Sequence, residues 1–284
     1  MPARPYRSVL YIPGSKERAL EKARGLACDA IIFDLEDAVS PQEKVNARDT
    51  LVSALSTGGF GNRARIVRIN GLDTEWAAGD IAALQGADFD ALLIPKVGSA
   101  ADVQAVADQI ADIPLWAMME TPAGMLNAAE IAAHPRMAGF VMGTNDLAKE
   151  LKCRFRADRL PMLTSLQLCL LAARAEGIVA VDGVYNAFKD EDGLRAECEQ
   201  GRDMGFDGKT LIHPAQLAIA NTAFAPTEAE IDLAERQIAA FDAAKAEGQG
   251  VAVVDGKIVE NLHIVTAQET LAKAAAIADL EGSL

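Results

Sequence analysis

Eight short runs of aliphatic and β-branched residues recur along the first 214 residues, and longer amphipathic, alanine-rich stretches separate them. The runs are Ser8–Gly14, Ala30–Asp37, Arg65–Gly71, Ala91–Val97, Pro114–Thr121, Ala138–Asp146, Val179–Tyr185 and Gly208–Pro214. Strands that alternate with helices in this way predict βαβ units and a parallel sheet. Eight units are the number that a (β/α)8 barrel requires, so we expect a TIM barrel. A doubly wound open sheet is the alternative, although no G-x-G-x-x-G motif follows the first run.

The repeat ends near Pro226, and a different pattern follows it. The stretch "TEAEIDLAERQIAAFDAAKAEG" predicts an amphipathic helix that begins with a capping box from Thr227 to Glu230. The next stretch, "GVAVVDGKIVE", predicts a hairpin because Asp255-Gly256 is a favoured two-residue turn. A last alanine-rich helix ends the chain. We therefore expect a barrel over residues 1–225 and a C-terminal helix–hairpin–helix extension over residues 226–284, which packs on the barrel and on a neighbouring subunit.

The charge balance of the chain limits the kinds of molecule that it is expected to bind. The chain carries 27 Lys and Arg against 41 Asp and Glu, a formal net charge of −14. Such an acidic balance disfavours binding to nucleic acid or to an anionic membrane, whereas local arginines or a metal can still attract an anionic substrate. No apolar run is long enough to span a bilayer, and no signal-peptide pattern opens the chain. The four cysteines show no C-x-x-C spacing, so we expect reduced thiols in a cytoplasmic protein.

Polar side chains gather at the carboxyl ends of the predicted strands, where barrel enzymes build their active sites. They are Asp34, Glu36 and Asp37 on the second run, Arg68 and Asn70 on the third, Lys96 on the fourth, Glu120 on the fifth, and Asn145 and Asp146 on the sixth. Carboxylates that converge without His or Cys suit a hard cation, Mg²⁺ or Mn²⁺, which can polarise a carbonyl or hold a hydroxy or keto acid. Arg68 is suited to clamp a substrate carboxylate. Taken alone, Glu120 and Asp146 fit equally well as surface or helix-capping acids.

A second candidate feature is the stretch "PGSKERALEK", which predicts a helix start at Ser15 and places Lys16, Arg18 and Lys22 on that helix. A helix N-terminus with nearby lysines suits phosphate groups. The residues alone favour the simpler interpretation of a capped, solvated helix.

Six stretches also resemble a known family: "RSVLYIPGS", "DAIIFDLEDAV", "RIVRINGLDT", "LLIPKVG", "METPAGMLNAAEI" and "GTNDLAKEL". They are similar to the citrate lyase β-subunit-like (HpcH/HpaI aldolase) superfamily, and most of all to its malyl-CoA lyase and malyl-CoA thioesterase branch. The similarity continues through "VDGVYNAFKDEDG" into the tail, so it covers nearly the whole chain. The resemblance implies a Mg²⁺-dependent barrel that acts on CoA thioesters of small hydroxy-dicarboxylic acids. It also implies a homotrimer or hexamer in which the C-terminal segment reaches over a neighbour's site.

The matching motif positions imply roles for individual residues. Glu120 and Asp146 would be the metal ligands, and Glu36 and Asp37 would hold metal-bound waters. Arg68 would contact the substrate oxygens, with Asn145 beside the substrate. Tyr11, Lys16 and Lys22 fall where the family contacts coenzyme A, which favours the phosphate interpretation of the first helix.

One position departs from the family's C–C lyases, which end the hairpin in a pattern like G-K-M-V-D with a general acid/base aspartate. This chain has "GKIVE", so the carboxylate is Glu260. The extra methylene moves the oxygens by roughly 1 Å, and a shift of that size can cost on the order of a hundredfold in rate. A repositioned carboxylate can instead activate water against the thioester carbonyl. We therefore expect hydrolysis of (3S)-malyl-CoA to (S)-malate and free CoA, with Glu260 as the base.

Two alternatives remain open. The chain can be a C–C lyase that cleaves malyl-CoA, citramalyl-CoA or β-methylmalyl-CoA to an acyl-CoA and an α-keto acid, with Glu260 replacing the aspartate at little consequence. It can also be a citrate lyase β-subunit that acts on a substrate bound to an acyl carrier. The lysines near "PGSK" and the extended tail favour the interpretations in which the substrate is a thioester of free CoA.

Overall fold

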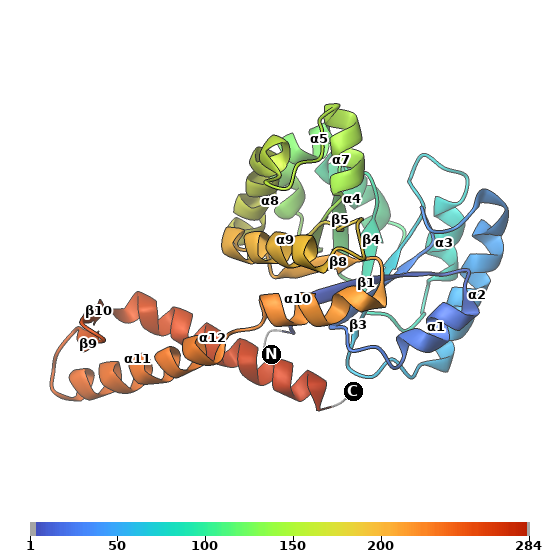
Figure 1. The fold of residues 1–284 in the computed structure, drawn as a ribbon. Coiled ribbons are helices and arrows are strands. Elements are labelled where there is room, and N and C mark those ends of the chain that lie inside the picture. The colour runs from blue at the N-terminus through green and yellow to red at the C-terminus, as the bar shows by residue number, and fades with distance from the viewer. Residues whose placement is uncertain (1–3, 283–284) are drawn as a thin grey trace. The chain divides into compact units, whose positions relative to one another are not determined.

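The computed structural model describes residues 4–282 and joins the eight predicted runs into one closed barrel (Figure 1). Its strands are β1 (Ser8–Pro13), β2 (Ala30–Asp34), β3 (Ala64–Arg68), β4 (Ala91–Ile94), β5 (Leu115–Met119), β6 (Met137–Met142), β7 (Val179–Asp182) and β8 (Gly208–Leu211). Each strand pairs in parallel with the next, and β8 closes the barrel against β1. The predicted (β/α)8 barrel is confirmed, and the open sheet is not formed.

Helices follow the strands and surround the barrel (Figure 1). They are α1 (Glu17–Ala23), α2 (Lys44–Thr57), α3 (Ala77–Ala83), α4 (Ala100–Ala107), α5 (Pro122–Leu126), α6 (Ala128–Ala132), α7 (Thr144–Leu151), α8 (Leu163–Glu176), α9 (Glu191–Met204) and α10 (Leu217–Phe224). Short 3-10 turns cover Pro41–Glu43, Leu160–Met162 and Pro214–Gln216.

The two-residue period of the strands decides which side chains fill the barrel. On β2, Ala30 and Ile32 belong to the cluster inside the barrel, whereas Ile31 and Phe33 pack in the layer under the helices. Asp34 follows in the inward series and ends the strand. The last inward position of a barrel strand therefore places a side chain on top of the packed interior, at the face where active sites form.

All eight strands end earlier than their runs predict, and in two of them the difference concerns candidate site residues. β2 ends at Asp34, so Glu36 and Asp37 lie in the following loop. β6 ends at Met142, and Asp146 lies in the first turn of α7. The runs were too long because each included the polar loop that follows its strand. The loop residues still stand at the carboxyl end of the barrel.

The chain divides into two compact units, the barrel over residues 6–224 and a second unit that contains residues 225–282. The second unit is made of α11 (Glu228–Ala246), the hairpin β9 (Ala252–Val254) and β10 (Lys257–Val259), and α12 (Asn261–Glu281). The two long helices pack along each other (Figure 1). The predicted two-residue turn is confirmed, because Asp255 and Gly256 have φ of 50° and 74° and Val254 pairs with Lys257.

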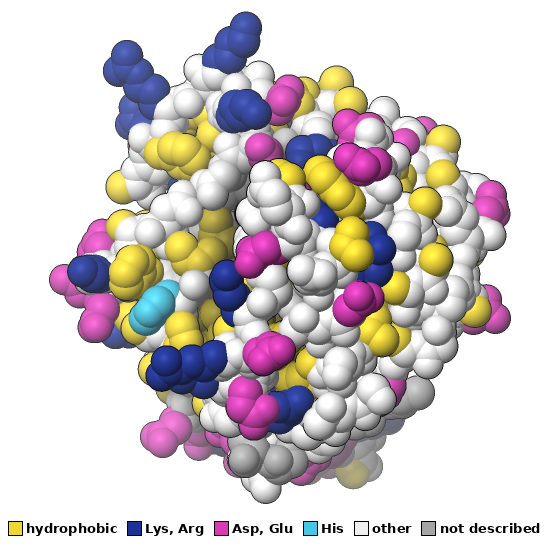
Figure 2. All heavy atoms as spheres, turned by 90° about the vertical axis from the view of Figure 1, so that its right-hand side faces the viewer, with side chains coloured by type: hydrophobic (Ala, Val, Ile, Leu, Met, Phe, Trp, Pro, Cys, Tyr) yellow, Lys and Arg dark blue, Asp and Glu magenta, His cyan; other side chains and the backbone are white. Residues whose placement is uncertain are grey.

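The charged surface and the state of the cysteines can be compared with what the composition predicts. In the face shown in Figure 2, acidic and basic side chains are interspersed and neither sign forms one broad field. No helix within residues 4–282 is long and apolar enough to cross a membrane. The four cysteines are free thiols, and burial raises the pKa of Cys28 to about 12, so this thiol stays protonated and unreactive.

Candidate active site

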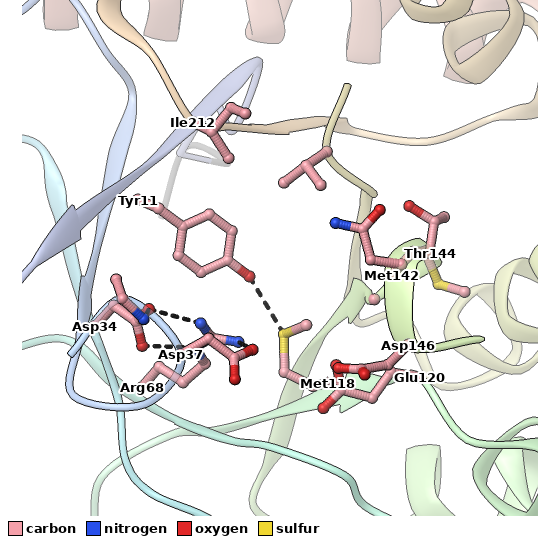
Figure 3. Close-up of a pocket in the computed structure, with 14 residues that line it drawn as sticks. Tyr11, Asp34, Asp37, Arg68, Met118, Glu120, Met142, Thr144, Asp146 and Ile212 are labelled. Atoms are coloured by element: carbon pink, nitrogen blue, oxygen red, sulfur yellow. Dashed lines mark hydrogen bonds and ion pairs between the residues drawn. The ribbon is translucent and has the colours of Figure 1, made fainter. Parts of the chain in front are cut away.

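A pocket of about 300 Å³ lies at the carboxyl ends of the barrel strands (Figure 3). It is lined by Tyr11, Asp34, Asp37, Ala38, Arg68, Met118, Glu120, Met142, Gly143, Thr144, Asn145, Asp146, Val184 and Ile212. These residues lie on or after every strand except β4. The fold thus brings together side chains that are more than 100 positions apart in the sequence, as the barrel prediction requires.

Arg68 is fixed by Asp34 on one side of the pocket. Its Nε lies 2.8 Å from Asp34 Oδ1 and its Nη2 lies 2.6 Å from Oδ2, a bidentate pair between adjacent strands. Although burial opposes ionisation, Arg68 holds the pKa of Asp34 below its ordinary value. The Asp34 oxygens also accept from the backbone N–H groups of Glu36 and Ala38. Asp34 therefore orients both the guanidinium and the loop that carries Glu36 and Asp37.

The aromatic ring of Tyr11 lies against the guanidinium of Arg68. The ring lies 5.0 Å from Arg68 Cζ, and the hydroxyl donates to Met118 Sδ at 3.4 Å (Figure 3). Burial raises the pKa of Tyr11 well above its usual value, so the hydroxyl remains a hydrogen-bond donor in the pocket. Asp34 and Tyr11 together hold Arg68, so its charge has a defined orientation toward the pocket.

Glu36 and Asp37 contact Arg68 rather than the other carboxylates. Arg68 Nη1 lies 2.8 Å from Glu36 Oε2 and 3.5 Å from Asp37 Oδ2. The Glu36 Oε1 atom is 2.6 Å from Lys96 Nζ. Burial raises the pKa of Glu36 in spite of these two cations. Asp37 lines the pocket and is largely exposed.

Glu120 and Asp146 form the acidic side of the pocket (Figure 3). Glu120 is buried, and its Oε1 accepts from the backbone N–H of Lys96 at 2.8 Å. Burial raises the pKa of Glu120 to about 7, and repulsion from Glu36 and Asp146 adds to this effect. A Cβ on Gly143 would stand 2.4 Å from both the Cβ and the Oε2 of Glu120, so the Glu120 carboxylate occupies space that only a glycine at 143 leaves open.

The acidic side fits a hard divalent cation. Within residues 4–282 no group of three or more His, Cys, Asp or Glu side chains is arranged to hold a metal. Mg²⁺ is commonly held by one or two carboxylates, because it keeps several waters and takes further oxygens from the substrate. Glu120 is buried near a second carboxylate, and a cation between them would remove the repulsion that raises the Glu120 pKa. The chemistry of these two donors therefore suits Mg²⁺.

Of the residues predicted to contact the substrate or coenzyme A, Asn145 lies at the pocket and the two lysines do not. Asn145 lines the pocket and exchanges two hydrogen bonds with Asn186, at 2.7 and 3.2 Å. Lys16 and Lys22 do not line it. Both are exposed, and Lys16 Nζ is 3.7 Å from Glu43. Their role toward coenzyme A stays a prediction.

Glu260 belongs to the second unit, where it is the N-cap residue of α12. The residue is exposed, and its backbone N–H donates to His263 Nδ1 at 3.0 Å. The hairpin carries apolar side chains on both faces. Val254 and Val259 are buried, whereas Val253 and Ile258 are more than half exposed. The catalytic role of Glu260 also stays a prediction.

Residue patterns singled out Asp34 and Lys96 at strand ends but gave neither a role. The signal for Asp34 is the period of β2, which puts it in the inward series with Ala30 and Ile32. Lys96 has no such signal, because its contact with Glu120 depends on an unusual backbone conformation with φ of 53°.

Comparison with known proteins places the chain among related enzymes. The sequence profile of the family described as HpcH/HpaI aldolase/citrate lyase matches residues 7–214. The chain is 74% identical over 276 residues to a (3S)-malyl-CoA thioesterase of Cereibacter sphaeroides, which covers 97% of each chain. It is 36% identical over 298 residues to an L-malyl-CoA/beta-methylmalyl-CoA lyase of the same species, with 94% of each chain covered.

A solved structure extends the comparison to ligands. The protein CitE of Mycobacterium tuberculosis, crystallised in complex with magnesium, acetoacetate and coenzyme A, is 30% identical to this chain. The two superpose with a TM-score of 0.81 over 97% of this chain and all of the CitE chain. The similarity therefore includes the second unit as well as the barrel.

Proposed function

We propose that this chain, which belongs to the HpcH/HpaI aldolase/citrate lyase family, hydrolyses (3S)-malyl-CoA to (S)-malate and free coenzyme A. The observation that carries the proposal is the full-length identity of 74% to a (3S)-malyl-CoA thioesterase, twice the 36% shared with the lyase. The pocket supports it, because a fixed guanidinium faces a pair of carboxylates across a space of about 300 Å³. Such a space accommodates a small dicarboxylic acyl group.

Arg68 orients the acyl group. Asp34 takes the Nε and Nη2 donors, so the Nη1 donor, which faces Glu36 and the exposed Asp37, is the one that a substrate oxygen shares. Because Asp34 and Tyr11 already fix the guanidinium, little rotational freedom is lost when the substrate binds. Asn145 also lines the pocket, where its amide can meet a second substrate oxygen.

Glu120 and Asp146 would hold the divalent cation, Mg²⁺ or alternatively Mn²⁺, and Glu36 and Asp37 would hold its waters. When bound, the cation supplies a positive charge that polarises substrate oxygens. The crystallised CitE was in complex with magnesium, which supports this assignment. The coenzyme A part of the substrate would contact Tyr11, Lys16 and Lys22, since Tyr11 lines the pocket and the two lysines follow β1 in sequence.

Glu260 would act as the general base. Its carboxylate accepts a proton from water, the water oxygen bonds to the thioester carbonyl carbon, the C–S bond breaks, and the CoA thiolate takes up a proton. The site needs a donor to the developing oxyanion, and Arg68 is the buried cation of the pocket that can provide it. Glutamate is longer than the aspartate of the family's lyases, which favours attack on the carbonyl by water over proton transfer at the methylene.

We further propose that Glu260 reaches the pocket of a neighbouring subunit in a homotrimer or hexamer. Glu260 lies between the exposed side chains of Ile258 and Leu262, each 62% exposed, and Val253 beside them is 65% exposed. Exposed apolar side chains that gather in this way are typical of a protein–protein interface. The hairpin segment that carries Glu260 would thus bury its apolar side chains against the neighbouring subunit and place the carboxylate at that subunit's pocket.

Mixed oligomers test this arrangement. Glu120→Gln and Glu260→Gln should each be inactive, and co-expression in equal amounts should restore about a quarter of the wild-type activity if each site combines two subunits in a closed ring. Glu260 acting within its own subunit would leave the mixture inactive. Separately assembled variants, mixed without exchange, are the control.

The lyase remains the second candidate because the 36% identity to the malyl-CoA lyase covers nearly the whole chain. One incubation with malyl-CoA and Mg²⁺ separates the two reactions. Free thiol and malate in equal amounts, without glyoxylate, establish the hydrolase. Glyoxylate with acetyl-CoA would establish the lyase and overturn the proposed function.

A further inference from the structure

We propose that Lys96 is a positioning residue that couples the two sides of the pocket, its backbone N–H aligning Glu120 while its ammonium group aligns Glu36 and, through it, Arg68. Lys96 follows β4, the strand that contributes no lining residue. The part of the proposal that concerns Arg68 rests on the proposed function. The part that concerns cation binding can be measured without substrate.

The backbone of Lys96 adopts a left-handed conformation, with φ of 53°. Residues that carry a Cβ disfavour this region, and among the described residues only Lys152, Arg159 and Asp255 share it with Lys96 outside glycine. The conformation turns the Lys96 amide toward Glu120 Oε1, at 2.8 Å. Since this carboxylate is buried, the direction of its oxygens depends on that donor.

The side chain of Lys96 reaches toward the opposite side of the pocket. Its Nζ lies 2.6 Å from Glu36 Oε1, and the second oxygen of Glu36 lies 2.8 Å from Arg68 Nη1. The chain of contacts crosses from the end of β4 to the loop after β2 and meets Arg68 on β3, the strand between them. Without the ammonium group, Arg68 would be the one cation left in an ion pair with Glu36 among residues 4–282, and Glu36 would draw the guanidinium away from a substrate oxygen.

The two contacts can be separated by substitution. Lys96→Gly and Lys96→Met remove the ammonium group, and glycine in addition adopts positive φ without strain. Lys96→Val removes the ammonium group and disfavours positive φ, so it displaces the amide that faces Glu120. Lys96→Arg keeps a cation of similar reach. Lys152 is the matched control, because it has φ of 55°, is exposed and does not line the pocket.

The variants should differ in the quantity that each contact controls. In calorimetric titrations with Mg²⁺ alone, Lys96→Gly and Lys96→Met should bind within about twofold of the wild type, and Lys96→Val about tenfold more weakly. With malyl-CoA, Lys96→Gly and Lys96→Met should raise KM about tenfold, and Lys96→Arg should recover most of that loss. Lys152→Gly and Lys152→Val should change neither quantity.

An unchanged Mg²⁺ affinity in Lys96→Val would overturn the backbone role. The same conclusion would follow if Lys152→Val weakened Mg²⁺ binding equally, or if the wild type did not bind Mg²⁺. Unchanged KM in both Lys96→Gly and Lys96→Met would overturn the side-chain role. If the wild type binds Mg²⁺ but does not hydrolyse malyl-CoA, the proposed function is wrong. In that case the comparison of Mg²⁺ affinity between Lys96→Gly and Lys96→Val still decides the backbone role.

Discussion

Replacing Glu120 by glutamine should abolish Mg²⁺-dependent activity and, at the same time, stabilise the metal-free protein at alkaline pH. Burial is the main reason that the pKa of Glu120 rises from an ordinary 4.5 to about 7. The folded protein therefore binds this proton more tightly than the unfolded chain does. Between these two values, folding stability falls as pH increases, because the folded state must either keep a proton or bear a buried charge.

The size of the effect follows from the difference in pKa. About 2.5 pH units at 1.36 kcal/mol each correspond to roughly 3 kcal/mol of lost stability above pH 7, most of it lost between pH 5 and pH 8. Glutamine carries no charge at any pH and keeps an oxygen that can accept from the Lys96 amide. The stability of Glu120→Gln relative to the wild type should thus increase by roughly 2–3 kcal/mol from pH 5 to pH 8.

Chemical denaturation in the presence of EDTA at pH 5, 6, 7 and 8 measures this difference, with circular dichroism as the signal. The corresponding change in Tm is on the order of 5–10 °C for a domain of this size. Adding Mg²⁺ at pH 8 should stabilise the wild type and leave the variant unchanged. A stability difference that stays constant across these pH values would refute the reasoning, since the buried charge would then not be the cause.

The remaining predictions concern the neighbours of Glu120 and the second unit. Arg68→Lys should raise KM for malyl-CoA by about tenfold to a hundredfold in steady-state assays, because lysine cannot make the bidentate pair with Asp34; an unchanged KM would remove Arg68 from substrate binding. Gly143→Ala places a Cβ 2.4 Å from Glu120, so Mg²⁺ affinity by calorimetry should fall at least tenfold, and an unaltered affinity would show that Glu120 is not confined there. Glu260→Ala should lower kcat by about a hundredfold or more without weakening CoA binding, whereas Glu260→Asp should gain glyoxylate formation if side-chain length decides the reaction; wild-type rates in both would exclude a catalytic Glu260.

Sequence reasoning reached the barrel because its strongest signals are local. Each strand is a short apolar run bounded by polar residues, and eight of them in series leave few ways to bury a parallel sheet. The extents of the strands were less accurate. Glu36 lies in a loop and Asp146 in a helix, although both were included in predicted strands. In the sequence, a polar residue just after a strand looks the same whether the chain continues straight or turns.

The partners within the site were harder to predict. The period of β2 and β3 places Asp34 and Arg68 in the same inward layer, but only the pairing register shows that they stand opposite each other. Lys96 meets Glu120 through its backbone, and neither residue type nor spacing reports a main-chain conformation. The environment that raises the Glu120 pKa likewise arises from packing among distant segments.

Water labelling tests hydrolysis by a general base most directly. A single turnover of malyl-CoA by excess enzyme in H₂¹⁸O should give free CoA and malate with one ¹⁸O in its new carboxylate, because water attacks the carbonyl itself. Unlabelled malate would show that an oxygen of the protein attacks first and would contradict the general-base role of Glu260. Glyoxylate in place of malate would contradict hydrolysis altogether.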